Sequence, residues 1–448
     1  MSVTSRIAVG TIQPEADLGI ILCALLETLR REGFQVQTFL SRADFSGYWA
    51  SADVTGLNPR QLDSWLMPSA ICQEIFAHGS ESADIALVQG TFSKRPKDVG
   101  GDLATLCQWL DLSRLVVLDA SRLDRCISLP RPEHLDGVLL DRVEDEEHLA
   151  WLSTNLEALW GVPILGALER LPELRAAIEG VPAGIHVPRD LYFELGNHFA
   201  RYWQPQYLKW LLRRAPLAEV PPRLYVDELE TSDLTVAVAF DEAFNCYFAE
   251  TFDLLEMRGA KVHDFSPLRD EQLPLNTDVV YLGCGHPEHH ASTLSENHCM
   301  KSALRNHVSK GGRIFAEGGG LAYLCQHLKT PDGALSRMAG LLPAVARLGG
   351  EPYHPVPTEV TLERTNWLAR SGDSVRGYRN NTWELEPVGA LNRFTGDGTT
   401  PWDLVGSFLV VGSLLHLNLA VQPGLLDRFF RPHLAHPHAH SDPWAPVS

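Results

Sequence analysis

The sequence predicts two α/β domains, each built on a doubly wound parallel sheet covered by helices. Three observations lead to this fold class. The chain is 448 residues long, short apolar runs alternate with amphipathic segments, and that alternation restarts halfway along. A chain of this length exceeds what one ordinary hydrophobic core accommodates. Strands separated by helices form parallel sheets buried on both faces, and such strands are continuous apolar runs.

The first half of the chain begins with an apolar run at 6–12, followed by an amphipathic segment at 18–34 that ends near Gly33. We expect a buried strand and then a helix, because the apolar residues of the second segment recur at helical spacing. Further apolar runs predict strands at 36–40, 83–90, 114–121 and 136–143.

A stretch rich in proline and acidic residues, 213–233, interrupts this pattern. Such composition is typical of connections between domains. The sequence therefore predicts one domain at 1–215, a linker at 216–233, a second domain at 234–432 and a histidine-rich tail at 433–448.

The second half repeats the alternation of strand and helix. The elements it predicts are a strand at 234–240, a helix at 248–260, a strand at 278–285, a strand into a turn at 312–320 and late strands at 407–420. Both halves therefore fit a doubly wound sheet.

Composition limits the classes of partner. The net charge is −18 and the pI is about 5.4, which argues against a phosphate-backbone partner such as nucleic acid. The eight cysteines form no CxxC pair, as expected in a reducing compartment rather than in a disulfide framework. The first residues show no basic segment followed by an apolar run, and no apolar stretch is long enough to span a membrane. We expect a cytoplasmic protein without a membrane partner.

The stretch "FAEGGGLAYL" at 315–324 has the pattern of a strand end, a tight turn and the start of a helix. Enzymes mount nucleophiles on such turns, where strained backbone exposes the reactive side chain. Here Gly318 occupies the tip and has no reactive atom. We expect positive φ at glycines 318 to 320, because a tight turn of this kind requires it and glycine alone tolerates it readily.

Several long motifs resemble the cobyrinate a,c-diamide synthase family, with its hydrogenobyrinate and nickel-sirohydrochlorin relatives. They are "AFDEAFNCYFAETFDLLEMRGAKVHDFSPLRDEQLP" (239–274), "YLGCGHPEHHASTLSEN" (281–297) and "FAEGGGLAYL", with thinner matches at 61–67, 83–90, 116–121 and 161–168. The resemblance implies an N-terminal ATP-binding domain similar to dethiobiotin synthetase and a C-terminal class I glutamine amidotransferase-like domain. In such proteins glutamine supplies ammonia, and ATP activates side-chain carboxylates of a tetrapyrrole-derived acid.

The amidotransferase motif of the family, A-E-C-G-G-L, places its cysteine nucleophile where this chain has Gly318. A thiolate must attack the glutamine amide, and glycine cannot. Cys284 and Cys325 are neighbouring thiols that could replace it as the nucleophile. Free cysteines are often small buried residues of the core, and this is the interpretation we favour for both. In "SLLHLNL" (413–419), His416 stands where the family has its catalytic base, and we interpret it as a remnant of that base.

The family P-loop resembles "GTIQPEADLG" at 10–19. Pro14 and Ala16 replace glycines, Asp17 replaces the phosphate-binding lysine, and Leu18 replaces the hydroxyl that holds magnesium. In "QGTFS" (89–93), Gln89 replaces a carboxylate that helps to hold the metal. We therefore expect the protein to use neither ATP, magnesium nor glutamine.

These losses favour a pseudoenzyme, a non-catalytic binder of a tetrapyrrole or corrinoid acid or a partner subunit in tetrapyrrole metabolism. We expect a homodimer, or a heteromer with a paralogue or a pathway enzyme. "DEAFNCYF" (241–248) and "GHPEHH" (285–290) persist beside the lost sites. The hypothesis is that Phe244, Tyr247, Glu288 and His290 contact the ligand.

Two enzymatic alternatives stay open. One is ATP- and ammonia-dependent amidation of side-chain carboxylates, and the other is a new chemistry in the interdomain cleft. The nearest match to the family's substrate motif, "VPAGIHVPRDL" (181–191), offers only His186 and Arg189 as anion contacts. The tail histidines 433, 436, 438 and 440 have spacings compatible with metal binding, but a solvated tail is the favoured interpretation.

Overall fold

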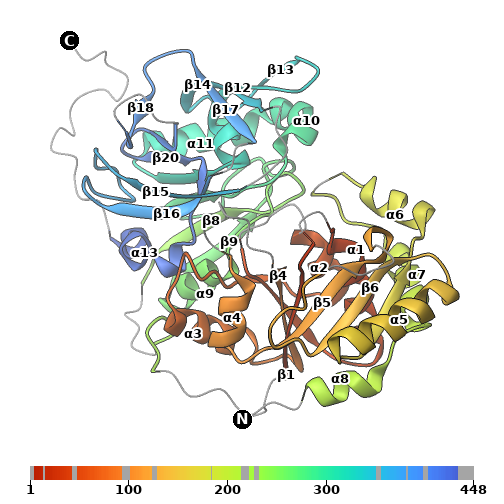
Figure 1. Cartoon of the computed structure of the whole chain (residues 1–448). Helices are drawn as coiled ribbons and strands as arrows, with labels where there is room; N and C mark the ends of the chain where they lie inside the picture. The colour runs from red at the N-terminus through yellow and green to blue at the C-terminus, as the bar shows by residue number, and fades with distance from the viewer. Residues whose placement is uncertain are drawn as a thin grey trace. The chain divides into compact units, whose positions relative to one another are not determined.

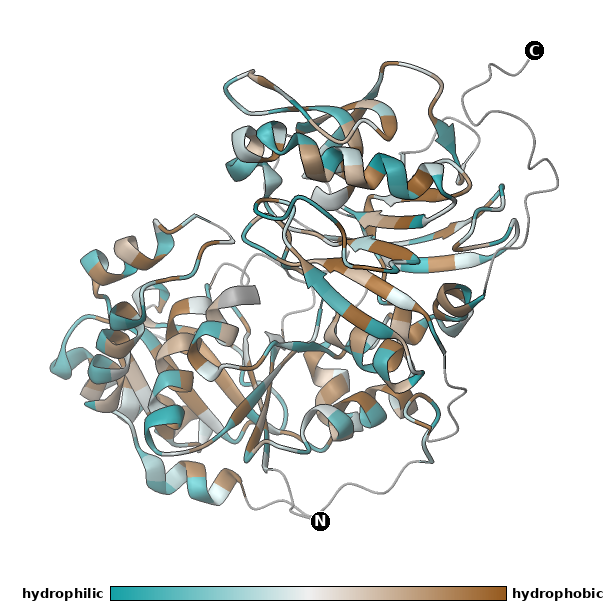
Figure 2. Ribbon diagram, turned by 180° about the vertical axis from the view of Figure 1, so that it is seen from behind, coloured by the Kyte–Doolittle hydropathy of each residue, from teal (hydrophilic) through white to brown (hydrophobic). Residues whose placement is uncertain are grey.

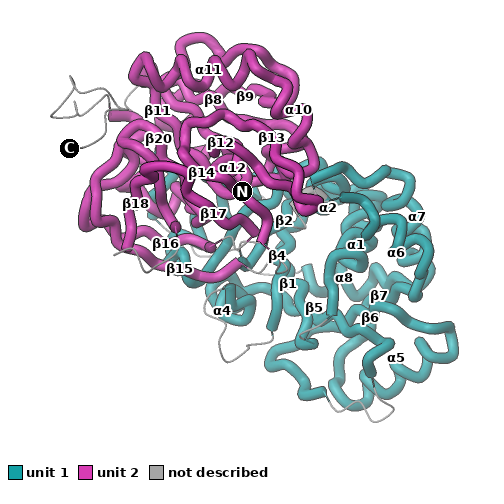
Figure 3. Tube along the Cα trace, turned by 90° about the horizontal axis from the view of Figure 1, so that it is seen from above, with its two compact units in different colours: residues 1–226, 248–250 teal, residues 227–247, 251–448 magenta. Residues whose placement is uncertain are grey.

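The chain forms two compact units in its computed structural model (Figure 3). The first comprises residues 1–226 and 248–250, and the second comprises 227–247 and 251–448. The boundary near residue 226 lies inside the range 216–233 that composition indicates as a linker. The structure describes residues 5–13, 16–42, 48–92, 101–123, 129–182, 184–212, 221–226, 232–349, 355–379, 382–396 and 402–431.

The first unit contains a seven-stranded parallel sheet with the order β3-β2-β4-β1-β5-β6-β7 (Figure 1). Its strands are β1 Ser5–Thr11, β2 Val36–Leu40, β3 Arg60–Gln61, β4 Ile85–Thr91, β5 Ser113–Asp119, β6 Gly137–Val143 and β7 Ile164–Glu169. Its helices are α1 Gly19–Arg31, α2 Tyr48–Thr55, α3 Ser69–Gly79, α4 Leu103–Trp109, α5 Glu146–Trp160, α6 Pro172–Glu179, α7 Arg189–Ala200 and α8 Pro205–Leu211.

Helices cover both faces of this sheet because successive strand residues point to opposite sides. In β5, Leu115 and Val117 belong to a core shared with α1 and α7, whereas Val116 and Leu118 belong to a second core shared with α5. The apolar runs are therefore continuous, as the sequence analysis expected of a doubly wound sheet. Hydrophobic residues are frequent along the strands, whereas each helix carries both hydrophobic and hydrophilic residues (Figure 2).

The second unit contains a seven-stranded sheet with the order β18-β19-β20-β11-β10-β8-β9. The strands from β20 to β9 are parallel, and β18 and β19 are antiparallel additions at one edge. The strands of this sheet are β8 Thr235–Ala239, β9 Lys261–Phe265, β10 Val279–Leu282, β11 Arg313–Glu317, β18 Asn392–Arg393, β19 Leu404–Gly406 and β20 Val410–Ser413. The helices are α9 Ala249–Met257, α10 Ala291–Glu296, α11 His298–Ser309, α12 Gly319–Leu324 and α13 Pro423–Phe430.

Two smaller sheets complete the second unit. One has the order β13-β12-β14-β17, from β12 Cys325–Lys329, β13 Leu335–Arg337, β14 Leu342–Leu348 and β17 Trp383–Pro387. The other has the order β15-β16-β21, from β15 Val356–Thr361, β16 Ser374–Arg379 and β21 Leu415–His416. Three short 3-10 helices, η1 Ala120–Arg122, η2 Pro287–His290 and η3 Leu419–Val421, link elements of the described chain.

The predicted fold class is confirmed: each unit is α/β and built on a parallel or mostly parallel sheet. The predicted elements fall on β1, α1, β2, β4, β5, β6, β8, α9, β10, β11 and β20–β21. Apart from β21, the strands of the two smaller sheets were not predicted, because exposed residues interrupt their apolar runs. None of the described helices combines the length and the apolar character needed to cross a membrane.

Candidate functional site: the turn after β11 and its neighbours

The turn after the middle strand of the second sheet has the backbone of a nucleophile turn. Gly318, between β11 and α12, has φ 49° and ψ −109°, and its N–H donates to the carbonyl of Ser413 at 2.9 Å. Positive φ of this kind strains any residue with a Cβ atom. The prediction of a tight turn tipped by Gly318 is confirmed in its geometry.

The expectation of positive φ was wrong for the next two glycines, which lie in the first turn of α12. They are required by close packing instead. A Cβ on Gly320 would lie 2.3 Å from the carbonyl oxygen of Leu282, and one on Gly319 would lie 2.7 Å from Cδ of Pro287. The helix therefore approaches the loop after β10 at backbone-contact distance.

Three parallel or adjoining strands bring a thiol, a carboxylate and an imidazole together beside this turn. Cys284 follows β10, Glu317 ends β11 and His416 ends β21. Sγ of Cys284 contacts Nδ1 of His416, and Nε2 of that ring lies 3.5 Å from the sulfur. All three side chains are buried, with exposed fractions of 3% or less. Cys284 and His416, predicted separately, thus form one cluster.

Glu317 was quoted in the sequence only as part of the family motif, and its role was missed. Its Oε1 accepts from the N–H of Leu417 at 2.7 Å, and its Oε2 accepts from the hydroxyl of Tyr281 at 2.8 Å. Burial raises the pKa of Glu317 to about 8 and lowers the pKa of His416 to about 3. Burial, with the nearby Glu317, also raises the pKa of the Cys284 thiol well above its usual range.

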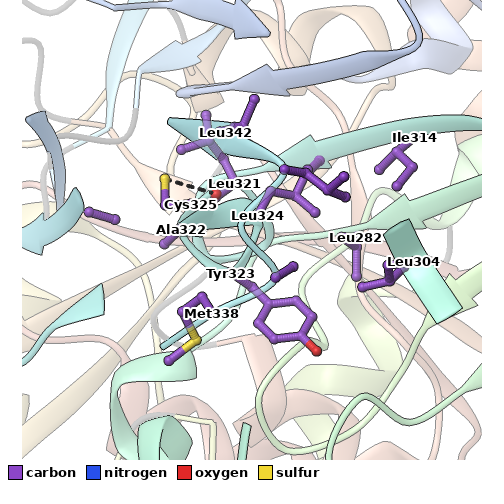
Figure 4. Close-up of a cluster of buried hydrophobic side chains, with 14 of the residues drawn as sticks. Leu282, Leu304, Ile314, Leu321, Ala322, Tyr323, Leu324, Cys325, Met338 and Leu342 are labelled. Atoms are coloured by element: carbon purple, nitrogen blue, oxygen red, sulfur yellow. Dashed lines mark hydrogen bonds between the residues drawn. The ribbon is translucent and has the colours of Figure 1, made fainter. Parts of the chain in front are cut away.

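Cys325 does not belong to this cluster. Counted from the turn, Cys325 was expected seven residues into the helix that follows it; this expectation was wrong, because α12 ends at Leu324 and Cys325 begins β12. Its side chain is fully buried among apolar neighbours, and Sγ donates to the carbonyl of Leu321 at 3.5 Å (Figure 4). The apolar residues of this segment fit either period, so spacing alone could not fix the boundary.

The two aromatic residues predicted to contact a ligand lie in the core. Phe244 is fully buried and packs on Tyr323, with ring centroids 5.5 Å apart. Tyr247 is 3% exposed; its hydroxyl donates to the carbonyl of Ala239 and accepts from the N–H of Gly283 at 2.9 Å. Both side chains are buried beside the loop after β10, so the structure gives them a packing role, and their contact with a ligand stays a prediction. Aromatic character alone does not distinguish a core ring from a lining ring.

The segment "GHPEHH" follows β10, and its last four residues form η2, Pro287–His290. Oε1 of Glu288 lies within hydrogen-bond distance of Nδ1 of His286, at 3.1 Å. The other carboxylate oxygen, Oε2, is buried without a hydrogen-bond partner among the described residues. His290 is half-buried, and burial lowers its pKa. Of the four predicted ligand contacts, Glu288 and His290 are therefore the two that lie outside the core.

The turn after β1 carries the residues predicted to have replaced a P-loop. Oδ1 of Asp17 accepts from the N–H of Gly19 at 2.8 Å, so this carboxylate binds the N-terminus of α1. Helix N-termini are the ordinary binding place of phosphate, and here the chain supplies its own anion. Pro14 lies outside the described residues. Gln89 lies in β4, where its backbone pairs with β1 and β2.

A second internal anion lies next to this turn. Asp119, at the end of β5, accepts from Nη1 of Arg142 at 2.8 Å and from Nε of Arg122 at 3.2 Å. Gln13 joins the two turns: its Oε1 accepts from the N–H of Asp119 at 2.7 Å. Burial acts to raise the pKa of Asp119, but the bonds from Ser121 and Arg142 outweigh it and lower that pKa.

His186, one of the two anion contacts suggested by the sequence, is already engaged. Its Nδ1 lies 2.5 Å from Oδ1 of Asp53, whose Oδ2 also accepts from the N–H of Val187. Arg189 is the first residue of α7. The tail histidines lie outside the described residues.

Comparison with known proteins identifies the family. A cobyrinate a,c-diamide synthase from Synechocystis sp. is 31% identical over 441 residues, which cover 91% of this chain and 89% of that protein. The chain belongs to the cobyrinate a,c-diamide synthase family. A synthase of the same name from Salmonella typhimurium is 26% identical, over 91% of this chain and 94% of the relative. Residues 235–386 match the model of the CobB/CobQ-like glutamine amidotransferase domain.

Among solved structures, a glutamine amidotransferase is similar to 43% of this chain and 96% of its own, with 18% identity and a TM-score of 0.33. The family membership confirms the resemblance on which the sequence analysis relied.

Proposed function

We propose that this protein binds a tetrapyrrole-derived carboxylic acid and that it does not hydrolyse glutamine. The observation that carries the second half of the proposal is Gly318. The turn keeps the backbone that would expose a nucleophile, and the side chain that would attack is absent. The neighbouring thiol, Cys284, is buried and neutral, which is the state of an inert cysteine.

The proposal also excludes ATP and magnesium as cofactors. Asp17 holds the N-terminus of α1, where a phosphate would otherwise lie, and a second negative charge there is repelled. Two unit charges about 4 Å apart repel by about 4 kcal/mol at an effective dielectric constant near 20. Without an activated carboxylate, amide formation from ammonia has no driving force from this chain. A non-catalytic binder or partner subunit fits these features.

Family membership supports a second candidate, ATP- and ammonia-dependent amidation of side-chain carboxylates. Its support is the kinship with named synthases across nine-tenths of the chain. This candidate requires that ATP binds by some cradle other than a P-loop. Calorimetry with ATP and magnesium separates the two: we expect no heat of binding, whereas a dissociation constant of about 10 μM, or about −7 kcal/mol, would favour amidation.

The glutaminase half of the proposal is tested with a glutamine-analogue electrophile. We expect no covalent adduct by intact mass and no release of ammonia from glutamine. An adduct mapped to Cys284 would overturn this part of the proposal, since it would identify a working thiol beside His416.

The ligand half is tested by thermal unfolding with cobyrinate, sirohydrochlorin, cobalamin and haem. A ligand at one hundred times its dissociation constant stabilises the fold by about 2.7 kcal/mol, which is a measurable shift. We expect the tetrapyrrole acid that shifts the wild type to act less on a His290→Ala variant. His263→Ala, an exposed histidine on the edge strand β9, is the matched control. No shift with any of the four compounds would contradict the proposal.

A further inference from the structure

The ends of neighbouring strands converge on one buried point of the second unit. β10 and β11 run parallel with Leu282 beside Ala316, and β11 pairs with β20 so that Glu317 lies beside Ser413. β21 follows directly after β20. Ligands of open α/β sheets bind outside the carboxyl ends of such strands. Here the side chains at those ends are Cys284, Glu317 and His416.

These three side chains offer one sulfur, one oxygen and one nitrogen, all within 4.8 Å of one another. Thiolate, carboxylate and imidazole are the donor types of zinc sites, and three protein ligands leave a fourth tetrahedral position for water or a ligand atom. The alternative, that Cys284 is simply a small buried residue of the core, would account for its packing. It would not explain why the sulfur lies next to both an imidazole and a carboxylate.

The carboxylate is held as a metal ligand would be. Leu417 donates its N–H to Oε1 of Glu317, and Tyr281 donates its hydroxyl to Oε2. Outer hydrogen bonds of this kind fix the orientation of coordinating carboxylates, and each oxygen keeps a lone pair for an ion. The loop that carries Cys284 is fixed as well, because Cys246 donates its N–H to the carbonyl of Cys284.

The charges of the cluster also suit a divalent cation. One thiolate, one carboxylate and one neutral imidazole carry two negative charges, which a divalent ion cancels. A neutral assembly avoids the large cost of an unpaired charge in an apolar interior. The thiol, and the carboxyl wherever it is still protonated, lose their protons to the solvent when the ion binds, so the balance is one ion bound and up to two protons released.

We propose that Cys284, Glu317 and His416 form a binding site for a zinc-type divalent cation, with a fourth position open to water or to a donor atom of a ligand. The site is independent of glutamine hydrolysis and of the tetrapyrrole proposal, because it uses neither Gly318 nor the proposed ligand contacts Glu288 and His290. It gives the retained His416 a role that needs no nucleophile at position 318.

Cobalt(II) is the probe, because it takes zinc sites and a cobalt–thiolate bond absorbs in the near ultraviolet. The full chain is refolded in the presence of cobalt chloride without oxygen, and bound metal is counted after gel filtration. We expect a single cobalt ion per chain at this site, with a thiolate charge-transfer band. Zinc should displace it and raise the unfolding temperature.

The controls separate this site from other donors. Replacement of His286 and His289 removes the other described cluster of possible ligands, and replacement of the tail histidines 433, 436, 438 and 440 by asparagine removes that segment's donors. Cys325→Ser and Cys299→Ser change a buried and an exposed thiol elsewhere. All of these variants should keep the band, whereas Cys284→Ala and His416→Gln should lose it.

A band that survives Cys284→Ala, or bound cobalt without a thiolate band in the wild type, would overturn the proposal. If Cys284→Ala fails to fold, the wild type still decides, because one equivalent of zinc should displace the cobalt and abolish the thiolate band. A wild type that binds no cobalt after refolding would also overturn the proposal.

Discussion

The turn after β11 and the turn after β1 occupy the same place in the two sheets. Each follows the middle strand of seven, flanked by parallel neighbours, and each leads into a helix. At the first turn Gly318 has positive φ and offers no reactive side chain. At the second turn the carboxylate of Asp17 accepts from the first N–H of the helix, the kind of place where phosphate binds in other proteins.

The two turns therefore differ in what holds the backbone and in what stands at the tip. After β11 the start of α12 is held by close packing of Gly319 and Gly320 against the loop after β10, and this packing does not involve a side chain at position 318. After β1 the helix N-terminus needs an anion, and a carboxylate of the chain satisfies it permanently. The first turn is expected to tolerate the return of a nucleophile more readily than the second tolerates a nucleotide.

The largest effect is expected where packing fixes the turn after β11. In a Gly320→Ala variant the new Cβ would lie 2.3 Å from the carbonyl oxygen of Leu282, and backbone cannot move aside as a side chain can. We expect a loss of about 3 kcal/mol in the free energy of unfolding, measured by urea denaturation. Gly424→Ala, with open space around its Cβ position, is the control and should lose nothing. Equal stability of the two variants would show that packing does not hold the turn.

A smaller cost with a gain of chemistry is expected for Gly318→Cys. Cysteine at φ 49° and ψ −109° stores strain of about 1–3 kcal/mol, which should appear as reduced stability. The new thiol should react with a glutamine-analogue electrophile, whereas the wild type should not. Peptide mapping locates the adduct, and His416→Gln in the same background tests whether the retained imidazole assists. A Gly318→Cys protein that folds and stays unlabelled would mean that the turn no longer presents its tip.

Much of the fold could be predicted from the sequence, because buried parallel strands are continuous apolar runs. β2 at Val36–Leu40 matches its predicted range, and β8 and β11 lie within theirs. The candidate site could be predicted only in part. Cys284 and His416 are 132 residues apart in sequence, and their contact depends on the order of β10, β11, β20 and β21.

Two other features could not be derived from residue types. Phe244 and Tyr247 are aromatic and close to the site in sequence, but whether a ring faces a core or a ligand depends on tertiary packing. Gly377, in β16, is a glycine for a reason visible only in three dimensions. A Cβ at that position would lie 2.4 Å from the carbonyl oxygen of His416.

The smallest effect concerns the charge at the turn after β1. Asp17→Ala removes the oxygen that accepts from the N–H of Gly19, and one such hydrogen bond contributes about 1 kcal/mol to stability. Asp17→Asn keeps an acceptor oxygen without the charge and should lose less, because the interaction of a carboxylate with a helix N-terminus contributes about 0.3–1 kcal/mol. Thermal unfolding of the wild type and the two variants, with and without inorganic phosphate, measures the order of their stabilities.

Phosphate stabilises most proteins to some degree by exclusion from their surface, so the informative quantity is the difference in phosphate effect between variant and wild type. If Asp17 fills the anion position of α1, phosphate should recover part of the loss in Asp17→Ala and add nothing specific to the wild type. Equal phosphate effects on both proteins would mean that the helix N-terminus is unavailable to anions for another reason, and the contrast between the two turns would then rest on the turn after β11 alone.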